Sequence, residues 1–348
     1  MNVRARTAAF DPETTAIAGV VGGLAALTVL AFVTGVVNPA YAAGLFCLSA
    51  LVGVLTRQGP TMKVLLGLAA LSTVLVLGLI MVYLFVKAWP VLEKMGPDLL
   101  VKTSEPLWDT SGHVYSLTPM IWGTVVTTGI AVAVAGPLGL AGAVFISEIA
   151  PGWAREIIKP AVEVLAGIPS IVYGFLGFMV LNPFMMYELS VPQNGTLLIA
   201  GLVIGVMALP TVVSVAEDAL AAVPEEMKSG SLALGSTDWQ TTTAVTIPAA
   251  LSGISAAVLL GVGRAVGETM AAVIILANVT EFPVPGFNVF DSTVSLTSLI
   301  ASQYGNASGM HLSALFAAGV VLFVTVMLLS VGSQLIERHM ERKLGGNQ

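Results

Sequence analysis

Long apolar stretches separated by shorter polar segments dominate the chain from residue 16 to residue 336. Almost every stretch is long enough to cross the ~30 Å hydrocarbon layer of a bilayer as a helix. Backbone polar groups in lipid must be hydrogen-bonded within their own segment, which favours helices over open strands. The pattern predicts eight spans, at about 16–37, 42–56, 64–88, 119–146, 160–182, 196–216, 247–277 and 311–336.

The second stretch is short and begins just after Asn38 and Pro39, so the first two spans are predicted to form a tight helical hairpin. We expect two parts: an N-terminal extension over residues 1–60, containing this hairpin, and a six-span body over residues 61–348. The second part also contains the largest cytoplasmic connection, residues 217–246.

Composition excludes the soluble classes of protein. The residues are 56% hydrophobic and 10% charged, against roughly 45–50% and about 25% in an average soluble domain. The expected fold class is therefore an all-α polytopic membrane protein. The single cysteine, Cys47, lies in an apolar stretch and excludes an internal disulfide framework.

The distribution of Lys and Arg predicts the orientation, because cytoplasmic loops carry an excess of these residues. With a cytoplasmic N-terminus, ten lie inside and three outside, and Arg264 within a span completes the 14. Both termini are then cytoplasmic, while the polar segments 89–118 and 278–310 lie outside. The ten are Arg4, Arg6, Arg57, Lys63, Arg155, Lys159, Lys228, Arg338, Arg342 and Lys343, and the three are Lys87, Lys94 and Lys102.

Arg264 and Glu268 lie inside the seventh predicted span. A charge at mid-membrane is costly, about 2.5–3.5 kcal/mol on insertion scales, and marks a functional site by default. Their i, i+4 spacing would place both on one helix face, where they could pair. One interpretation is a buried ion pair that fixes helix packing. The other is a translocation pathway in which Arg264 offers a fork of donors to an oxyanion and Glu268 holds it in place.

Pro137 and Pro169 lie within predicted spans and would interrupt the helical hydrogen bonding there. Such breaks suit a pathway, although packing kinks use proline too. Ser170 and Tyr173 could offer hydroxyls to a passing anion or hydrogen-bond neighbouring helices. Three acidic residues near cytoplasmic ends are expected to be solvated or to cap helices: Glu148, Glu163 and Glu217.

The cytoplasmic loop contains a second candidate site. A short helix that ends at Gly235 and a second helix that begins near Asp238 would form a protruding helix-turn-helix. Its apolar residues suggest a surface that contacts a partner, although the loop could also pack back on its own bundle. The residues expected to make the contact are Glu226, Met227, Lys228, Ser229, Gly230, Leu232 and Gly235.

This loop resembles the EAA loop of binding-protein-dependent ABC importer permeases. Ser229-Gly230-Ser231 occupies the Glu-Ala-Ala positions, Gly235 the glycine, and Val245-Thr246-Ile247-Pro248 the closing element. Ser229 replaces the acid of the pattern, although Glu225 and Glu226 lie just upstream. In that family the loop docks onto a separate ATPase subunit, and the resemblance implies the same use here.

Three further stretches resemble the PstC-type permeases of phosphate-specific ABC importers more than their PstA-type partners. They are Pro137–Gly142 with Phe145–Pro151, Glu163–Gly174, and Arg264–Ala271. The match extends over about residues 61–340, which leaves residues 1–60 as an unmatched extension.

The resemblance implies a membrane permease subunit of an ATP-driven phosphate importer. The implied partners are a homologous second permease, two ATPase subunits, an external phosphate-binding protein and membrane lipid, with no nucleic acid. Residues 217–246 would couple the permease to ATP hydrolysis. ATP and magnesium would bind the ATPase subunit, because this chain has no G-x-x-x-x-G-K-[ST] loop. We expect no catalytic residue, cofactor or metal site in the chain itself, since its three histidines are widely scattered.

Alternatives stay open at this level. The substrate could be molybdate, sulfate or phosphonate, or the chain could be the PstA-type partner. A standalone secondary transporter would predict an inverted repeat, which the sequence does not show. An intramembrane enzyme would need a catalytic pair, and a structural scaffold would leave Arg264 unexplained.

Overall fold

The computed structural model describes residues 12–35, 38–188, 190–191 and 195–344. Nearly all of its regular structure is helical. Among these residues, seven helices are long and apolar enough to cross a membrane, and an eighth span results if a helix pair bent by 72° counts as one. The seven are Thr14–Thr34, Pro39–Thr56, Gln58–Met95, Thr118–Ile149, Ser170–Glu188, Leu197–Ala221 and Gly309–Gly332, and the bent pair is Asp238–Ala249 with Leu251–Gly267. The expectation of an all-α polytopic membrane protein is confirmed.

The chain divides into two compact units, Met1–Tyr83 and Leu84–Gln348. In the first unit, helices α1 (Pro12–Thr34) and α2 (Pro39–Thr56) pack side by side, as the sequence predicted. Asn38 caps α2 by accepting a hydrogen bond from the Ala40 amide at 3.0 Å, and Pro39 occupies the first turn, where its missing N–H is harmless. The division falls inside α3 (Gln58–Met95), later in the chain than the boundary expected after residue 60.

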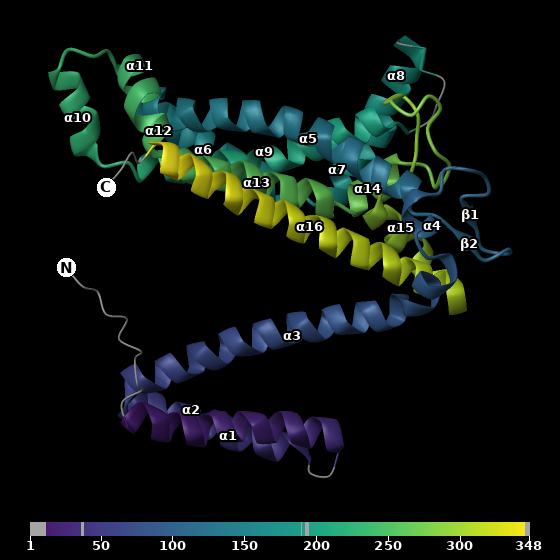
Figure 1. Cartoon of the computed structure of the whole chain (residues 1–348). Coiled ribbons are helices and arrows are strands. Elements are labelled where there is room, and N and C mark those ends of the chain that lie inside the picture. The colour runs from purple at the N-terminus through teal and green to yellow at the C-terminus, as the bar shows by residue number, and fades with distance from the viewer. Residues whose placement is uncertain (1–11, 36–37, 189, 192–194, 345–348) are drawn as a thin grey trace. The chain divides into compact units, whose positions relative to one another are not determined.

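The centre of the second unit is made by three long helices that pack against one another: α5 (Thr118–Val144), α9 (Leu197–Ala221) and α13 (Leu251–Gly267) (Figure 1). Glycines allow the close approach. A Cβ added at Gly201 would lie 2.6 Å from Ile130, and one at Gly261 would lie 2.6 Å from Val212. Packing of this kind stabilises membrane helices, because lipid provides no hydrophobic drive between them.

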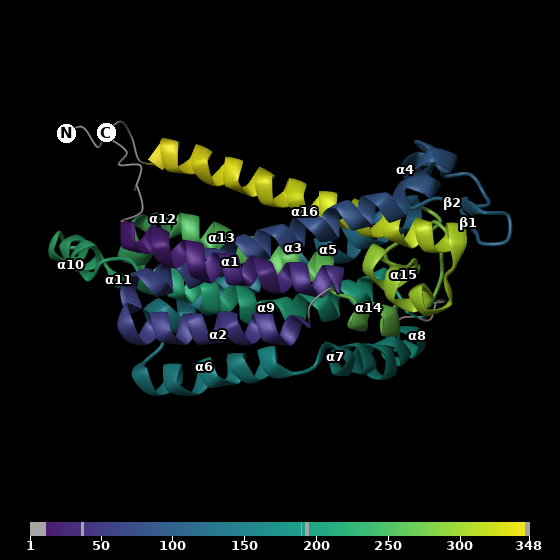
Figure 2. The ribbon, with the colours of Figure 1, turned by 90° about the horizontal axis from the view of Figure 1, so that it is seen from below.

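The remaining helices surround this centre, and α6 and α7 follow one another along one flank (Figure 2). Three short segments are π-helical: η1, η2 and η3. The bounds are α6 Gly152–Gly167, α7 Ser170–Leu176, α8 Asn182–Glu188, α12 Ile247–Ala249, α14 Met270–Ile275, α15 Leu296–Gln303 and α16 Gly309–Leu344, with η1 Phe145–Ile149, η2 Gly177–Leu181, η3 Thr242–Thr246 and the 3-10 turn η4 Tyr304–Asn306.

The two ends of the second unit differ in character (Figure 1). At one end lie α4 (Asp98–Val101) and an antiparallel hairpin of β1 (Trp108–Asp109) and β2 (Val114–Tyr115), in which Trp108 pairs with Tyr115. At the opposite end the hairpin of α10 (Glu225–Ala233) and α11 (Asp238–Thr241) projects from the bundle. The polar segments expected on opposite sides of the membrane thus lie at opposite ends.

Two of the predicted spans are interrupted by a helix break in the structure. The stretch 160–182 contains the end of α6, a break at Ile168 and Pro169, and then α7 with η2. The stretch 247–277 contains α13, a break at Glu268 and Thr269, and the short α14. Both breaks fall inside apolar sequence, which hydrophobicity alone reads as continuous helix.

Candidate functional site

Glu268 lies in the break between α13 and α14, and Arg264 lies in the last turn of α13. Glu268 has an extended backbone, with φ −66° and ψ 125°, directly after the last helical residue of α13, Gly267. The Thr297 hydroxyl donates a hydrogen bond of 2.7 Å to the Glu268 carbonyl. One carboxylate oxygen of Glu268 accepts from the Ala271 amide at 3.2 Å, in the first turn of α14. The Glu268 carboxylate and the Thr297 hydroxyl therefore each pair a backbone group at the break.

Arg264 and Glu268 do not share a helix face, which corrects the expectation drawn from their spacing. Glu268 lies beyond the end of α13, and no ion pair joins it to Arg264 in the described part of the chain. The Nε–H group of Arg264 instead donates to the Met207 carbonyl of α9 at 3.1 Å. The arginine side chain is thus held at its Nε–H while the residue as a whole stays exposed in the single chain.

The break between α6 and α7 lies at Ile168 and Pro169, both with extended ψ values near 130°. The Tyr173 hydroxyl reaches back across it and donates to the Leu165 carbonyl at 2.9 Å. Ser170 is half-buried at the start of α7. Tyr173 thus hydrogen-bonds a neighbouring helix, one of the two uses considered for its hydroxyl.

The segments that follow the two breaks, α7 and α14, pack directly on each other. A Cβ added at Gly174 would lie only 2.8 Å from the Ala271 Cα, so the backbones approach as closely as a glycine allows. Tyr173 also lies close enough to Arg264 for an electrostatic interaction. The structure therefore brings together Tyr173, Arg264 and the Glu268 break, which are far apart in the sequence.

Pro137 does not break its helix. Helix α5 continues through it from Thr118 to Val144, and Pro137 itself is exposed. The expected interruption at Pro137 is absent, whereas Pro169 does stand at a break.

The predicted helix-turn-helix is present between α9 and α13. Gly235 follows α10 with φ +91°, a conformation that favours glycine. Thr237 and Gln240 form a capping box at the start of α11, with hydrogen bonds of 3.3 and 2.9 Å. Local sequence signals therefore determine both the turn and the second helix.

The hairpin exposes its apolar residues instead of burying them. Leu234 is 90% exposed and Trp239 60% exposed, and Met227 and Leu232 are also exposed. Glu226, Ser229 and Gly230 lie on the exposed surface of α10 as well, and the Ser229 hydroxyl donates to the Glu226 carbonyl at 3.3 Å. The loop contacts its own bundle through an ion pair of Lys228 and through buried residues of η3, whereas no residue of α10 is buried in the single chain.

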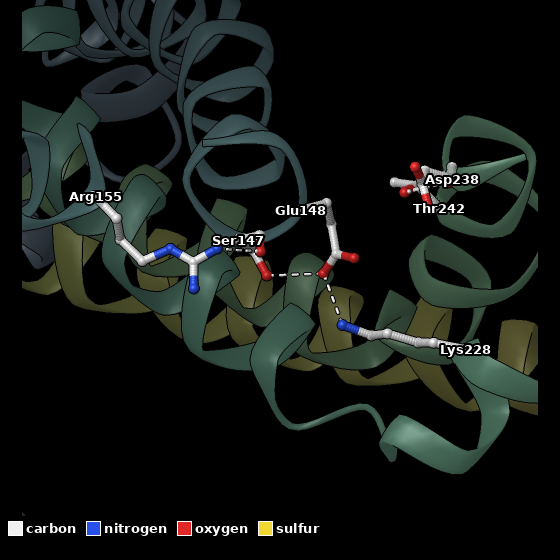
Figure 3. A network of polar contacts seen from close by, with 6 residues as sticks. All are labelled: Ser147, Glu148, Arg155, Lys228, Asp238 and Thr242. Atoms are coloured by element: carbon white, nitrogen blue, oxygen red, sulfur yellow. Dashed lines mark hydrogen bonds and ion pairs between the residues drawn. The ribbon is translucent and has the colours of Figure 1, made fainter. Parts of the chain in front are cut away.

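Two acidic residues expected to be solvated or capping form ion pairs instead. Glu148 pairs with Lys228 of α10 at 2.9 Å (Figure 3), and Glu217 pairs with Lys159 at 2.9 Å. Both carboxylate side chains are only 10% exposed. Glu148 and Lys228 are 80 residues apart, so no local pattern could have paired them.

No three His, Cys, Asp or Glu side chains gather in a way that could hold a metal ion, as far as the described residues show. The candidate site consists of a guanidinium beside a helix break, with an exposed apolar hairpin at the other end of the bundle.

Comparison with known proteins gives relatives over most of the chain. It is 33% identical over 298 residues to the "Phosphate transport system permease protein PstC" of Haemophilus influenzae, which covers 80% of this chain and 93% of the relative. It is 32% identical over 291 residues to the protein of that name from Mesorhizobium japonicum, covering 78% and 87%. The "Probable ABC transporter permease protein YqgH" of Bacillus subtilis is 39% identical over 216 residues, covering 62% and 69%.

Solved structures agree on the fold. A bacterial alginate ABC transporter, crystallised with a periplasmic protein bound to an alginate pentasaccharide, matches with a TM-score of 0.57 and 14% identity, covering 83% of this chain and 98% of that one. The MetNI methionine ABC transporter in an inward-facing form matches with a TM-score of 0.52 and 20% identity, covering 65% and 96%. The profile described as "Binding-protein-dependent transport system inner membrane component" matches residues 135–345. The chain belongs to this family of inner-membrane transport components.

Proposed function

We propose that the chain is the permease subunit of an ATP-driven phosphate importer and forms half of its translocation path. The observation that carries the proposal is the placement of Arg264. This basic residue lies beside a helix break in a membrane permease, and its side chain is exposed in the single chain. The names of the relatives from Haemophilus influenzae and Mesorhizobium japonicum support phosphate as the substrate.

Arg264 would bind the anion through its two Nη groups. Its Nε–H already donates to the Met207 carbonyl, so the fork is held in one orientation. Charge-assisted contacts of this kind suit a tetrahedral oxyanion and offset part of the cost of removing it from water. Glu268 lowers the net positive charge near the break without contacting Arg264, and this favours release of the anion. Ser170 and Tyr173 complete the proposed pathway.

The face around Arg264 would receive the homologous second permease. Gly263 and Gly267 flank Arg264 and are exposed, and a Cβ added at either would meet no described atom within 4 Å. Small residues spaced in this way let another helix approach closely. The pathway would then lie between the two permeases.

The α10–α11 hairpin would dock onto one of two ATPase subunits, which bind the ATP and magnesium. Its exposed Leu234 and Trp239 are typical of an anchor for a partner protein. The excess of Lys and Arg on the hairpin side of the membrane makes that side cytoplasmic, with both termini there. The segments 89–118 and 278–310 would then face the external phosphate-binding protein.

Transport of labelled phosphate into sealed vesicles tests the proposal. The two permeases and the ATPase subunits are reconstituted with the binding protein outside the vesicles and ATP at the hairpin side. We expect phosphate to accumulate only with ATP, and excess unlabelled molybdate or sulfate not to compete. Uptake without ATP would indicate a secondary transporter, and competition by another oxyanion would change the assigned substrate.

A further inference from the structure

Helix α10 contacts the bundle through very little of its own surface. None of its residues is buried, and its packing is mainly against α11 and η3 of the same loop. Lys228 of α10 does face the bundle, since its side chain is only 16% exposed and its Nζ lies 2.9 Å from the Glu148 carboxylate. A second polar contact of α10, the hydrogen bond of 3.0 Å from the Thr241 hydroxyl to the Ser231 hydroxyl, stays within the loop, whereas the ion pair reaches the end of α5.

Glu148 belongs to a short network of polar contacts at the end of α5 (Figure 3). The Ser147 hydroxyl donates to the same Glu148 oxygen at 2.8 Å, and Arg155 Nη2 of α6 donates to the Ser147 carbonyl at 2.8 Å. Lys228 is thereby joined to α5 and to the first turn of α6 at once.

Glu148 and Ser147 lie in η1, the π-helical turn that ends α5. Isolated π-turns have wider hydrogen bonding than an α-helix and occur frequently at functional sites. Helix α5 in turn packs along α9, which carries the Met207 carbonyl that holds Arg264. A displacement of η1 therefore acts on the two helices at the centre of the bundle.

We propose that the Lys228–Glu148 ion pair is the clasp that transmits movement of α10 to α5, with Lys228 and Glu148 acting as positioning residues. The inference rests on the proposed function, in which an ATPase subunit moves the hairpin. Without the clasp, α10 would be linked to the bundle chiefly through its packing on α11 and η3 of its own loop. ATP hydrolysis would then still move the hairpin, but the helices at the centre of the bundle would move less.

Charge reversal tests the clasp in the complete transporter. Lys228→Glu and Glu148→Lys each place like charges together, whereas the double variant restores an ion pair with its polarity exchanged. The measurement is the amount of phosphate transported per ATP hydrolysed in vesicles. We expect each single variant to lower this ratio about tenfold, equivalent to the loss of a pair worth about 1.4 kcal/mol, and the double variant to recover most of it. An unchanged ratio in the single variants, or no recovery in the double variant, would overturn the proposal.

Lys159→Ala is the matched control. It removes a second Lys–Glu pair of the same length, between α6 and α9, and leaves α10 untouched. We expect this variant to lose thermal stability while keeping its phosphate-to-ATP ratio. A ratio that falls as far as in Lys228→Glu would show that any ion pair at this end matters equally, which contradicts a specific clasp.

A distance measurement separates the clasp from the choice of substrate. In a Cys47→Ser background, spin labels are attached at Glu225→Cys in the first turn of α10 and at Ile149→Cys in η1, both exposed positions. With ATPase subunits bound, the distance between the labels should stay constant on adding ATP and should change in the Lys228→Glu variant. Equal changes in both proteins would refute the clasp, and this readout holds even if the transported solute is not phosphate.

Discussion

Arg264 lies well inside a predicted span, whereas the other Lys and Arg residues lie in loops or at span ends, and the structure leaves it exposed beside a helix break. Arg264→Ala should lower phosphate uptake about 10- to 100-fold, because hydrogen bonds to charged groups contribute about 1.5–3 kcal/mol each. Arg264→Lys keeps the charge but loses the planar guanidinium, so its phosphate uptake should lie between that of the unmodified protein and that of Arg264→Ala. Uptake is compared in vesicles that contain equal amounts of assembled transporter.

Unchanged uptake by Arg264→Ala in an assembled complex would remove this residue from the pathway. Binding of the ATPase subunits serves as the internal control, since the hairpin precedes the start of α13, whereas Arg264 lies in its last turn, and the hairpin should not respond to the change.

At the scale of single residues, the sequence singled out Arg264 and Glu268 but not the hydrogen-bond partners that the structure gives them. The i, i+4 spacing of Arg264 and Glu268 assumes an unbroken helix, whereas α13 ends at Gly267. The break is held by Thr297, which lies 29 residues further along and donates to the Glu268 carbonyl. Because that bond joins distant segments, local periodicity carries no signal for it.

Pro137 and Pro169 show the same limit at the scale of elements. Both prolines remove one helical hydrogen bond. Helix α5 packs against α9 on both sides of Pro137, through buried residues such as Ala135 and Gly139, and this packing keeps the helix continuous. The α10–α11 hairpin was predictable by contrast, because the positive φ of Gly235 and the Thr237 capping box are local features.

The contact between α7 and α14 leads to a prediction about how the two broken helices depend on each other. In Gly174→Val, the added Cβ would lie only 2.8 Å from the Ala271 Cα, so the two backbones must move apart. Overpacking of this kind costs about 1–3 kcal/mol. We expect a lower thermal midpoint in detergent and weaker transport, since the helices that follow both breaks are displaced.

Gly129→Val in α5 is the matched control, because a Cβ there would meet no described atom within 4 Å and the residue is exposed. Its thermal midpoint should stay at or slightly above that of the unmodified protein. If both variants unfold at the same temperature, the close approach at Gly174 has no special role.

At the scale of the whole molecule, every proposed functional residue lies in the second unit, between Leu84 and Gln348. Removing residues 2–57 takes away α1 and α2, which pack on each other, and leaves α3 to start the chain. An even number of spans is removed, so the orientation set by the remaining Lys and Arg residues is kept. We therefore expect ATP-driven uptake to be retained in the shortened protein.

Removal of residues 2–37 alone gives the informative comparison. It deletes one span, which leaves an odd number and places the N-terminus on the wrong side for the remaining charges. This variant should insert poorly, as judged from its amount in the membrane. A normal membrane level of the 2–57 deletion with no uptake would instead assign the extension a direct role in transport.

The orientation itself can be tested with thiol labelling, because Cys47 is the single cysteine of the chain. In a Cys47→Ser background, new cysteines at Leu234 and Phe287 stand at 90% and 83% exposed positions, on the α10–α11 hairpin and in the segment 278–310 respectively. The excess of Lys and Arg on the hairpin side predicts that a membrane-impermeant maleimide added to intact cells labels Phe287→Cys but not Leu234→Cys. Inverted vesicles that lack the ATPase subunits should give the opposite pattern. Labelling of both positions from one side would mean that the two ends of the second unit do not lie on opposite sides of the membrane. The proposed path from the external segments to the ATPase hairpin would then be impossible.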